Sequence, residues 1–140
     1  MTRAARLTPE ECDRLDCLRH PVDYSRVRVH RAGSGDAFRR FVLWVSQGRA
    51  VALGNHVYLP ARCNGDLRVL AHELTHCGQY QAWGPLRYYA RGVVEQLRDL
   101  VYRAFGIGRS PYEYELEAGR PFESYGMEQQ AQIVEDSFRA

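Results

Sequence analysis

Hydrophobic and polar residues follow different periods in different parts of the chain. Residues 25–31 (SRVRVHR) alternate apolar and polar side chains, which is typical of a half-buried strand. Residues 49–60 (RAVALGNHVYLP) predict two short strands joined by a turn at Gly54 and Asn55. Residues 36–47 instead repeat apolar side chains at helical spacing. The first half of the chain is therefore expected to mix strands and helix.

Other segments predict mainly helices. A short helix is expected over residues 8–19, where Thr-Pro-Glu-Glu provides a start signal. Residues 84–108 predict a long helix with a Gly-Pro start and glycines at its end, and residues 127–139 predict the last helix. Residues 111–126 are expected to be extended and turn-like. This order predicts one α+β domain over residues 1–140, with short strands before the central helix and mainly helices after it.

Composition leaves the predicted fold unchanged and argues against some classes of function. The chain has 45% hydrophobic residues, 26% charged residues and a net charge of +2, which is too mild to indicate a nucleic-acid partner. Its longest strongly apolar run, FVLWV at 41–45, is far shorter than the ~20 residues of a membrane span. Because no apolar stretch follows the N-terminal charges, we expect no classical signal peptide. We expect synthesis in the cytosol, followed by retention there or export through a specialised secretion system.

The chemistry-bearing motif is His-Glu-x-x-His, within residues 68–81 (RVLAHELTHCGQYQ). Leucines at three- and four-residue steps and the start signal Asn64-Gly65-Asp66 predict a helix here, which Gly78 would weaken. On a helix, His72 and His76 lie one turn apart on the same face, so both rings can reach one metal ion. Glu73 lies beside that face, within reach of a water molecule at the metal. The alternative is two surface histidines on a core helix, and the motif in its helical context favours the metal site.

The four cysteines are expected to be free thiols in a reducing compartment. Cys12, Cys17 and His20 raise the alternative of a structural metal site, but their spacing matches no common zinc pattern. Cys77 is expected to point away from the metal face and to contribute to packing.

Two histidines do not complete a catalytic zinc site, which usually has three protein ligands and an open fourth position. No histidine follows His76, so a downstream third ligand must be acidic. The candidates are Glu95, Asp99, Glu113, Glu115, Glu117, Glu128, Glu135 and Asp136.

Several segments resemble a known family. VRVHRAG, AVALGNHVYLP and VLAHELTHCGQYQ resemble, in order and style, the core domain of extracellular contractile injection systems, a bacterial domain of the zinc-metallopeptidase type. YEYELEAGRPFESYGMEQQAQIVEDSF is similar to a related branch found with Rhs-type toxins and type VI secretion genes. Together these segments cover most of residues 26–138. The resemblance implies a zincin-like fold and secretion-system or Rhs-type toxin components as partners.

The resemblance also implies a glutamate as third zinc ligand, in a Glu-x-x-Ala pattern on a helix. This pattern occurs at Glu115-Leu-Glu-Ala118 and at Glu128-Gln-Gln-Ala131. We favour Glu128, because it opens a good helix and EQQA is the string of the related branch. Glu115 lies in a segment whose alternating aromatic residues are typical of a strand.

The expected activity is zinc-dependent peptide-bond hydrolysis. Zinc held by His72, His76 and Glu128 would activate water and polarise the substrate carbonyl, with Glu73 as general base. An oxyanion donor is also needed, and Tyr80, Tyr125 and His56 are conceivable, although none is assigned. Glu135 or Asp136 could hold the second nitrogens of the ligating imidazoles, and a solvated position is the alternative for both.

We expect a peptide or protein substrate, which could add as an extended strand to a sheet edge around residues 49–59. His56 and Tyr58 would then lie near the scissile bond. The rival function is a catalytically silent zincin that serves as a zinc-stabilised binding or delivery module. A third interpretation is a domain cut from a larger toxin.

Overall fold

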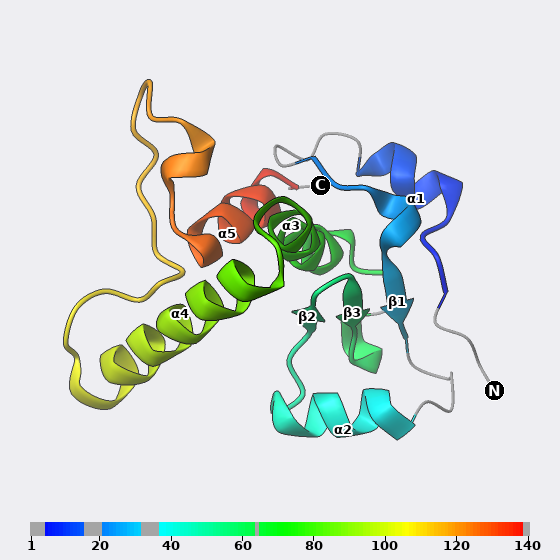
Figure 1. Cartoon of the computed structure of the whole chain (residues 1–140), viewed down its shortest axis with the longest axis horizontal. Coiled ribbons are helices and arrows are strands. Elements are labelled where there is room, and N and C mark those ends of the chain that lie inside the picture. The colour runs from blue at the N-terminus through cyan, green and yellow to red at the C-terminus, as the bar shows by residue number, and fades with distance from the viewer. Residues whose placement is uncertain (1–4, 16–20, 32–36, 64, 139–140) are drawn as a thin grey trace.

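The protein is built around one helix, α3 (Leu67–Trp83), which lies between a small sheet and the last helix, α5 (Met127–Ser137) (Figure 1). This computed structural model describes residues 5–15, 21–31, 37–63 and 65–138. Every residue of α3 from Leu70 to Gln79 is buried. A helix covered in this way can hold polar side chains out of water on one face while it fills the core with the other.

The sheet has three strands, β1 (Arg28–His30), β2 (Val51–Leu53) and β3 (His56–Tyr58), in the order β1-β3-β2. β1 and β3 are parallel, whereas β2 and β3 are antiparallel and form the predicted hairpin. Its turn is at Gly54-Asn55, and Gly54 has a positive φ of 64°, as such tight turns require. The mixed α+β class and the hairpin predicted from the sequence are confirmed.

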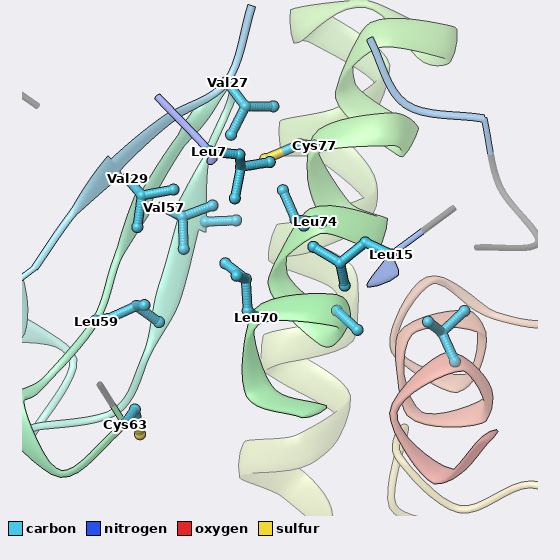
Figure 2. Close-up of a cluster of buried hydrophobic side chains, with 13 residues drawn as sticks. Leu7, Leu15, Val27, Val29, Val57, Leu59, Cys63, Leu70, Leu74 and Cys77 are labelled. Atoms are coloured by element: carbon cyan, nitrogen blue, oxygen red, sulfur yellow. The ribbon is translucent and has the colours of Figure 1, made fainter. Parts of the chain in front are cut away.

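One row of side chains joins this sheet to α3. Val29, Val57 and Ala52 are cross-strand neighbours, and all three are buried against the helix. Figure 2 shows that Leu70 and Leu74 of α3 meet this row from the other side. The leucines predicted to form the apolar face of the helix therefore form the core. Cys77 belongs to the same core, as expected from its place off the metal face.

The other helices surround this centre. α1 (Pro9–Arg14) begins with a capping box, in which Thr8 and Glu11 exchange side-chain to backbone hydrogen bonds of 3.0 and 3.1 Å. α2 (Ala37–Val45) contacts β3 and lies below the strands in Figure 1, and α4 (Pro85–Phe105) extends away from the body (Figure 1). Among the described helices, none has the length and hydropathy of a membrane span.

Some of the elements predicted from the sequence differ in extent or type from those of the structure. The strand expected from residue 25 begins at Arg28, because Asp23 accepts hydrogen bonds from the amide and hydroxyl of Ser25 and holds a 3-10 turn there. Gly78 does not shorten α3, since the helix continues to Trp83. Residues 111–126 are irregular and turn-like as predicted, with one 3-10 turn, but no strand forms at the alternating aromatic residues around Glu115. The C-terminal part of the helix expected over residues 8–19, together with Cys17 and His20, lies outside the described residues.

Candidate metal centre

The helix that carries the motif has a well-defined start. Asp66 is its N-cap, and its carboxylate accepts hydrogen bonds from the amides of Arg68 and Val69 at 3.0 and 3.3 Å. One turn further on, the rings of His72 and His76 lie on the same face with centroids 5.2 Å apart. The predicted juxtaposition of the two imidazoles is therefore present.

The third side chain comes from α5. The Glu128 Oε2 atom lies 3.2 Å from His76 Nε2 and 3.4 Å from His72 Nε2. One donor atom from each of the three residues falls within a group no wider than 4.8 Å. The exposed fractions are 9% for His72, 5% for His76 and 6% for Glu128, so the site is largely shielded from solvent. Two imidazole nitrogens and a carboxylate oxygen that converge in this way can hold one divalent metal ion.

The other acidic candidates are not in this group, which is the one His/Cys/Asp/Glu cluster of metal-binding size within the described ranges. Glu115 is exposed in the irregular segment after α4. Glu95 and Asp99 are buried on α4, where Asp99 pairs with Arg103 at 3.0 Å. Asp136 accepts a hydrogen bond from the Tyr114 hydroxyl at 2.6 Å.

Gln79 orients His76. Its side-chain oxygen lies 2.8 Å from His76 Nδ1, and as an acceptor it requires the proton of the neutral ring to be on that nitrogen. In the neutral ring this leaves the lone pair of Nε2, the nitrogen on the side of Glu128, available to a metal ion. Gln79 is fully buried and also donates from Nε2 to the Met127 carbonyl and to Gln130, both at 3.0 Å. It thus connects the orientation of a histidine on α3 to the start of α5.

The second nitrogen of His72 has a different environment. His72 Nδ1 is buried and has no hydrogen-bond partner within the described part of the chain, and Glu135 Oε1 lies 4.0 Å from it. The carboxylate expected to support an imidazole is therefore close to His72 without reaching it. Asp136, the alternative, faces Tyr114 instead.

Glu95 supports the start of α5. The N-cap of this helix is Gly126, which has no side chain to accept a hydrogen bond, and the Glu95 carboxylate of α4 accepts one from the Met127 amide at 3.2 Å. Gln129 adds a second contact by accepting from the Gly126 amide at 2.8 Å. The first turn of α5, which carries Glu128, is therefore held from outside the helix.

The buried charges act on one another. Burial opposes ionisation of Glu128, but the charges and hydrogen bonds of His76 and His72 outweigh it and hold the pKa of that carboxyl well below its usual range. Burial also disfavours a charged His76, yet the Glu128 carboxylate dominates and raises the pKa of this imidazole to about 9. Without a metal, His76 and Glu128 therefore form an ion pair at neutral pH.

Glu73 lies beside the group and is 6% exposed. Burial raises the pKa of its carboxyl above the ordinary value, although the nearby His72 and His76 lower it. A carboxylate whose pKa is raised in this direction is a better proton acceptor than a solvated glutamate. Glu73 is thus placed next to the three convergent side chains without being one of them.

These residues form the floor of an open cleft of about 660 Å³. The residues around it come from the end of α2, from β2 and from α4, and the floor is formed by His72, Glu73, His76 and Glu128. The Tyr88 hydroxyl joins the two sides by donating to the Ala52 carbonyl of β2 at 3.1 Å.

None of the oxyanion donors considered from the sequence is among the described residues that line the cleft. Tyr125 donates no hydrogen bond toward it and accepts one from the Glu117 amide, while His56 lies 3.0 Å from His30. His56 and Tyr58, which were expected near the scissile bond, are not among the described residues that line the cleft, because β3 is the inner strand and β2 borders the cleft. The tyrosines at the cleft are Tyr88, Tyr89 and Tyr112.

Sequence reasoning missed Gln79 and Tyr112 as residues of the site. Gln79 could have been found, since it lies three residues after His76 and therefore on the same helix face. Tyr112 lies in an irregular segment. Neither a hydrophobic period nor a fixed distance in sequence from the His-Glu-x-x-His motif relates it to the site. Burial and the nearby Glu128 raise the pKa of its hydroxyl to about 12, so it remains a hydrogen-bond donor at neutral pH.

Among the comparisons with known proteins, a family model matches just under half of the chain. Residues 18–84 match the family model of the eCIS (extracellular contractile injection system) core domain. The matched residues include the sheet, α3 and the whole His-Glu-x-x-His motif, but not Glu128. No match is found among curated proteins or among solved structures. The family match supports the eCIS part of the resemblance and, with it, an association with secretion-system components.

Proposed function

We propose that this protein is a zinc-dependent peptidase of the Glu-zincin type that acts in association with a secretion system or an Rhs-type toxin. The observation that carries the proposal is the position of Glu73 at the floor of an open cleft, beside the convergent His72, His76 and Glu128. A site with a purely structural metal has no need for an open approach or for an adjacent base.

The residues at the site fit zinc. Two histidines and one glutamate form one of the ligand sets of catalytic zinc sites, in which a fourth position is open. The hydrogen bond from His76 Nδ1 to Gln79 leaves Nε2 as the ligand atom, and zinc-binding histidines are usually oriented by such a hydrogen bond from their other nitrogen. When bound, zinc supplies Lewis-acid chemistry, because it lowers the pKa of water and polarises a carbonyl group.

The remaining steps belong to side chains of this protein. Glu73 accepts a proton from the attacking water, whose oxygen forms the new bond to the carbonyl carbon. Glu73 then delivers this proton to the amide nitrogen as the carbon–nitrogen bond breaks. Tyr112 lines the cleft and its hydroxyl is protonated at neutral pH, so it is our candidate donor to the carbonyl oxygen.

The sheet edge offers a place for the substrate backbone. The outer edge of β1 is occupied by Ala5, which exchanges hydrogen bonds of 2.8 and 3.1 Å with Val29, whereas β2 is the edge strand at the cleft. An extended peptide could add to β2 beside Glu73. The Ala52 carbonyl already accepts from Tyr88, but a carbonyl oxygen can accept a second hydrogen bond.

One observation favours the rival function, a zinc-stabilised binding or delivery module without catalysis. The three proposed ligands come from two helices that pack on each other, so a metal would also cross-link α3 and α5. The same ligand set therefore serves both functions, and Glu73 distinguishes them.

The deciding experiment replaces Glu73 with glutamine, which keeps size and polarity but removes the basic carboxylate. We expect Glu73→Gln to retain zinc, measured by elemental mass spectrometry, and to lose ~100- to 10,000-fold in the rate of cleavage of a mixed peptide library. Should the wild type cleave nothing while a delivery phenotype survives in Glu73→Gln, the binding module is the better account.

The ligand assignment is tested in the same preparation. Glu128→Ala should strip the zinc, whereas Glu115→Ala, which changes an exposed glutamate of the alternative Glu-x-x-Ala pattern, should leave the zinc content unchanged. Loss of zinc in Glu115→Ala with retention in Glu128→Ala would refute the assignment.

A further inference from the structure

One wall of the cleft is an exposed apolar stripe on α4. Tyr89, Val93, Leu97 and Leu100 recur at steps of four, four and three residues, so they lie on one face of the helix. These side chains are 45%, 59%, 56% and 63% exposed. A helix of a globular protein normally turns such a face toward the core. On α4 the buried residues are instead Tyr88 and two acidic residues, Glu95 and Asp99.

The opposite wall is also apolar. Val45 from the end of α2 is 61% exposed and Leu53 of the edge strand is 37% exposed, and both line the cleft together with Val51. The two apolar walls and the floor that contains Glu73 belong to one cleft. Exposed apolar side chains that converge on a polar floor are typical of a site that binds an apolar ligand in a fixed orientation.

The dimensions match a short stretch of extended chain. Tyr89 and Leu100 are separated by about 16 Å along the axis of α4, at 1.5 Å per residue. An extended peptide rises about 3.3 Å per residue, so the stripe runs beside about five residues. Alternate side chains of such a peptide point in opposite directions, which lets one set contact α4 while the backbone follows β2.

We infer that the cleft binds an extended polypeptide segment with large apolar side chains, and that the α4 stripe selects these side chains. The inference rests on the proposed function, because it places the bound segment at the site where Glu73 would act. It names a substrate class: apolar segments that are buried in folded proteins and accessible in unfolded or extended ones. The cleft is also lined by Asp99 and Arg103, but these two already pair with each other at 3.0 Å, so a charged segment would lose hydration between the apolar walls with little gain.

The test measures binding separately from cleavage. Full-length Glu73→Gln protein loaded with zinc is titrated against two fluorescent octapeptides that differ only at three central positions, leucine in one and serine in the other. We expect the leucine peptide to bind at least tenfold more tightly by fluorescence anisotropy. Equal affinity for the two peptides would overturn the inference.

Two neighbouring residues of α4 supply a matched pair of variants. Val93 lines the cleft and Val94 does not, although they are 59% and 56% exposed. When added to the Glu73→Gln protein, Val93→Asp should lower the affinity for the leucine peptide tenfold or more. Val94→Asp should change the same affinity less than threefold. Both should melt at the same temperature as the parent. Similar losses in the two variants would show non-specific adhesion and refute the inference.

The remaining outcomes separate this inference from the proposed function. If sedimentation shows a stable dimer that the leucine peptide does not dissociate, a second copy covers the stripe and the inference is wrong. If the wild type cleaves the mixed library without preference for apolar residues, the inference fails and the peptidase stands. If the leucine peptide binds as expected and the wild type cleaves nothing, the inference stands and the peptidase proposal fails.

Discussion

At the scale of single residues, the most informative side chain outside the motif is Gln79. It is an uncharged polar residue at the end of the fully buried segment of α3, and both polar atoms of its side chain have partners there. A buried side-chain amide costs free energy unless each of its polar atoms has a hydrogen-bond partner. Gln79 and its partners therefore hold one another in position. The orientation of His76 thus depends on a contact that also includes the backbone of α5.

We predict that Gln79→Ala weakens zinc binding by about 10- to 100-fold, because His76 loses the acceptor that selects its tautomer. Affinity can be measured by competition with a chromogenic chelator. Gln130→Ala is the control, since Gln130 is equally buried and pairs with Gln79 but does not contact a histidine. Equal losses of affinity in the two variants would indicate that Gln79 acts through general packing.

At the scale of elements, the start of α5 depends on α4. Helix N-termini leave amides without partners inside the helix, and a side chain at the N-cap usually accepts from one of them. Gly126 cannot do so, and Glu95, 31 positions earlier in the chain, accepts from the Met127 amide in its place. The carboxylate also lies at the positive end of the α5 dipole. The position of Glu128 in the first turn of α5 therefore depends on Glu95, a residue of α4.

We predict that Glu95→Ala lowers the free energy of unfolding by about 1–2 kcal/mol, the usual cost of a lost cap. It should also weaken zinc binding, because the first turn of α5 carries Glu128. Glu95→Gln keeps an acceptor for the Met127 amide and should restore most of both quantities, as measured by urea unfolding and by chelator competition. A failure of glutamine to restore them would mean that the charge, rather than the hydrogen bond, holds the helix.

At the scale of the whole molecule, the candidate metal centre lies at the contact between the region that matches the eCIS core domain and a helix that follows it. The sheet and α3 lie within the region that matches the eCIS core domain, whereas α4 and α5 follow it. The matched region contains two of the proposed ligands and the base, and α5 contributes the third ligand. A bound metal would therefore stabilise the docking of α5 onto α3.

We predict that removal of zinc lowers the melting temperature by about 10 °C. Zinc that binds only the folded chain, at a free concentration a thousandfold above its dissociation constant, contributes about 4 kcal/mol by mass action. In a chain of this length each kcal/mol corresponds to roughly 3 °C. Thermal unfolding with and without a chelator measures this shift. The chelator should have no effect on Glu128→Ala, and an unchanged melting curve of the wild type after verified metal removal would refute the prediction.

The sequence by itself determined the local features of this protein. The period of apolar residues placed most helices and the β2–β3 hairpin, since period reflects which face of an element is buried. The start of α1 at Thr8, the turn at Gly54 and the adjacency of His72 and His76 on α3 all depend on residues within four positions of one another. At this range backbone geometry alone relates the side chains.

Only the tertiary structure decided which distant side chains meet. The order of residues alone left eight acidic candidates as partners for the two histidines, and the family resemblance favoured Glu128. The packing of α5 on α3 is what brings Glu128 to the histidines, with Glu135 beside His72. The same packing places Tyr112 at the cleft and leaves the apolar stripe of α4 uncovered. Hydrophobic periodicity shows that a face is apolar, but it carries no information on what covers that face, because burial against a partner is non-directional and depends on the whole fold.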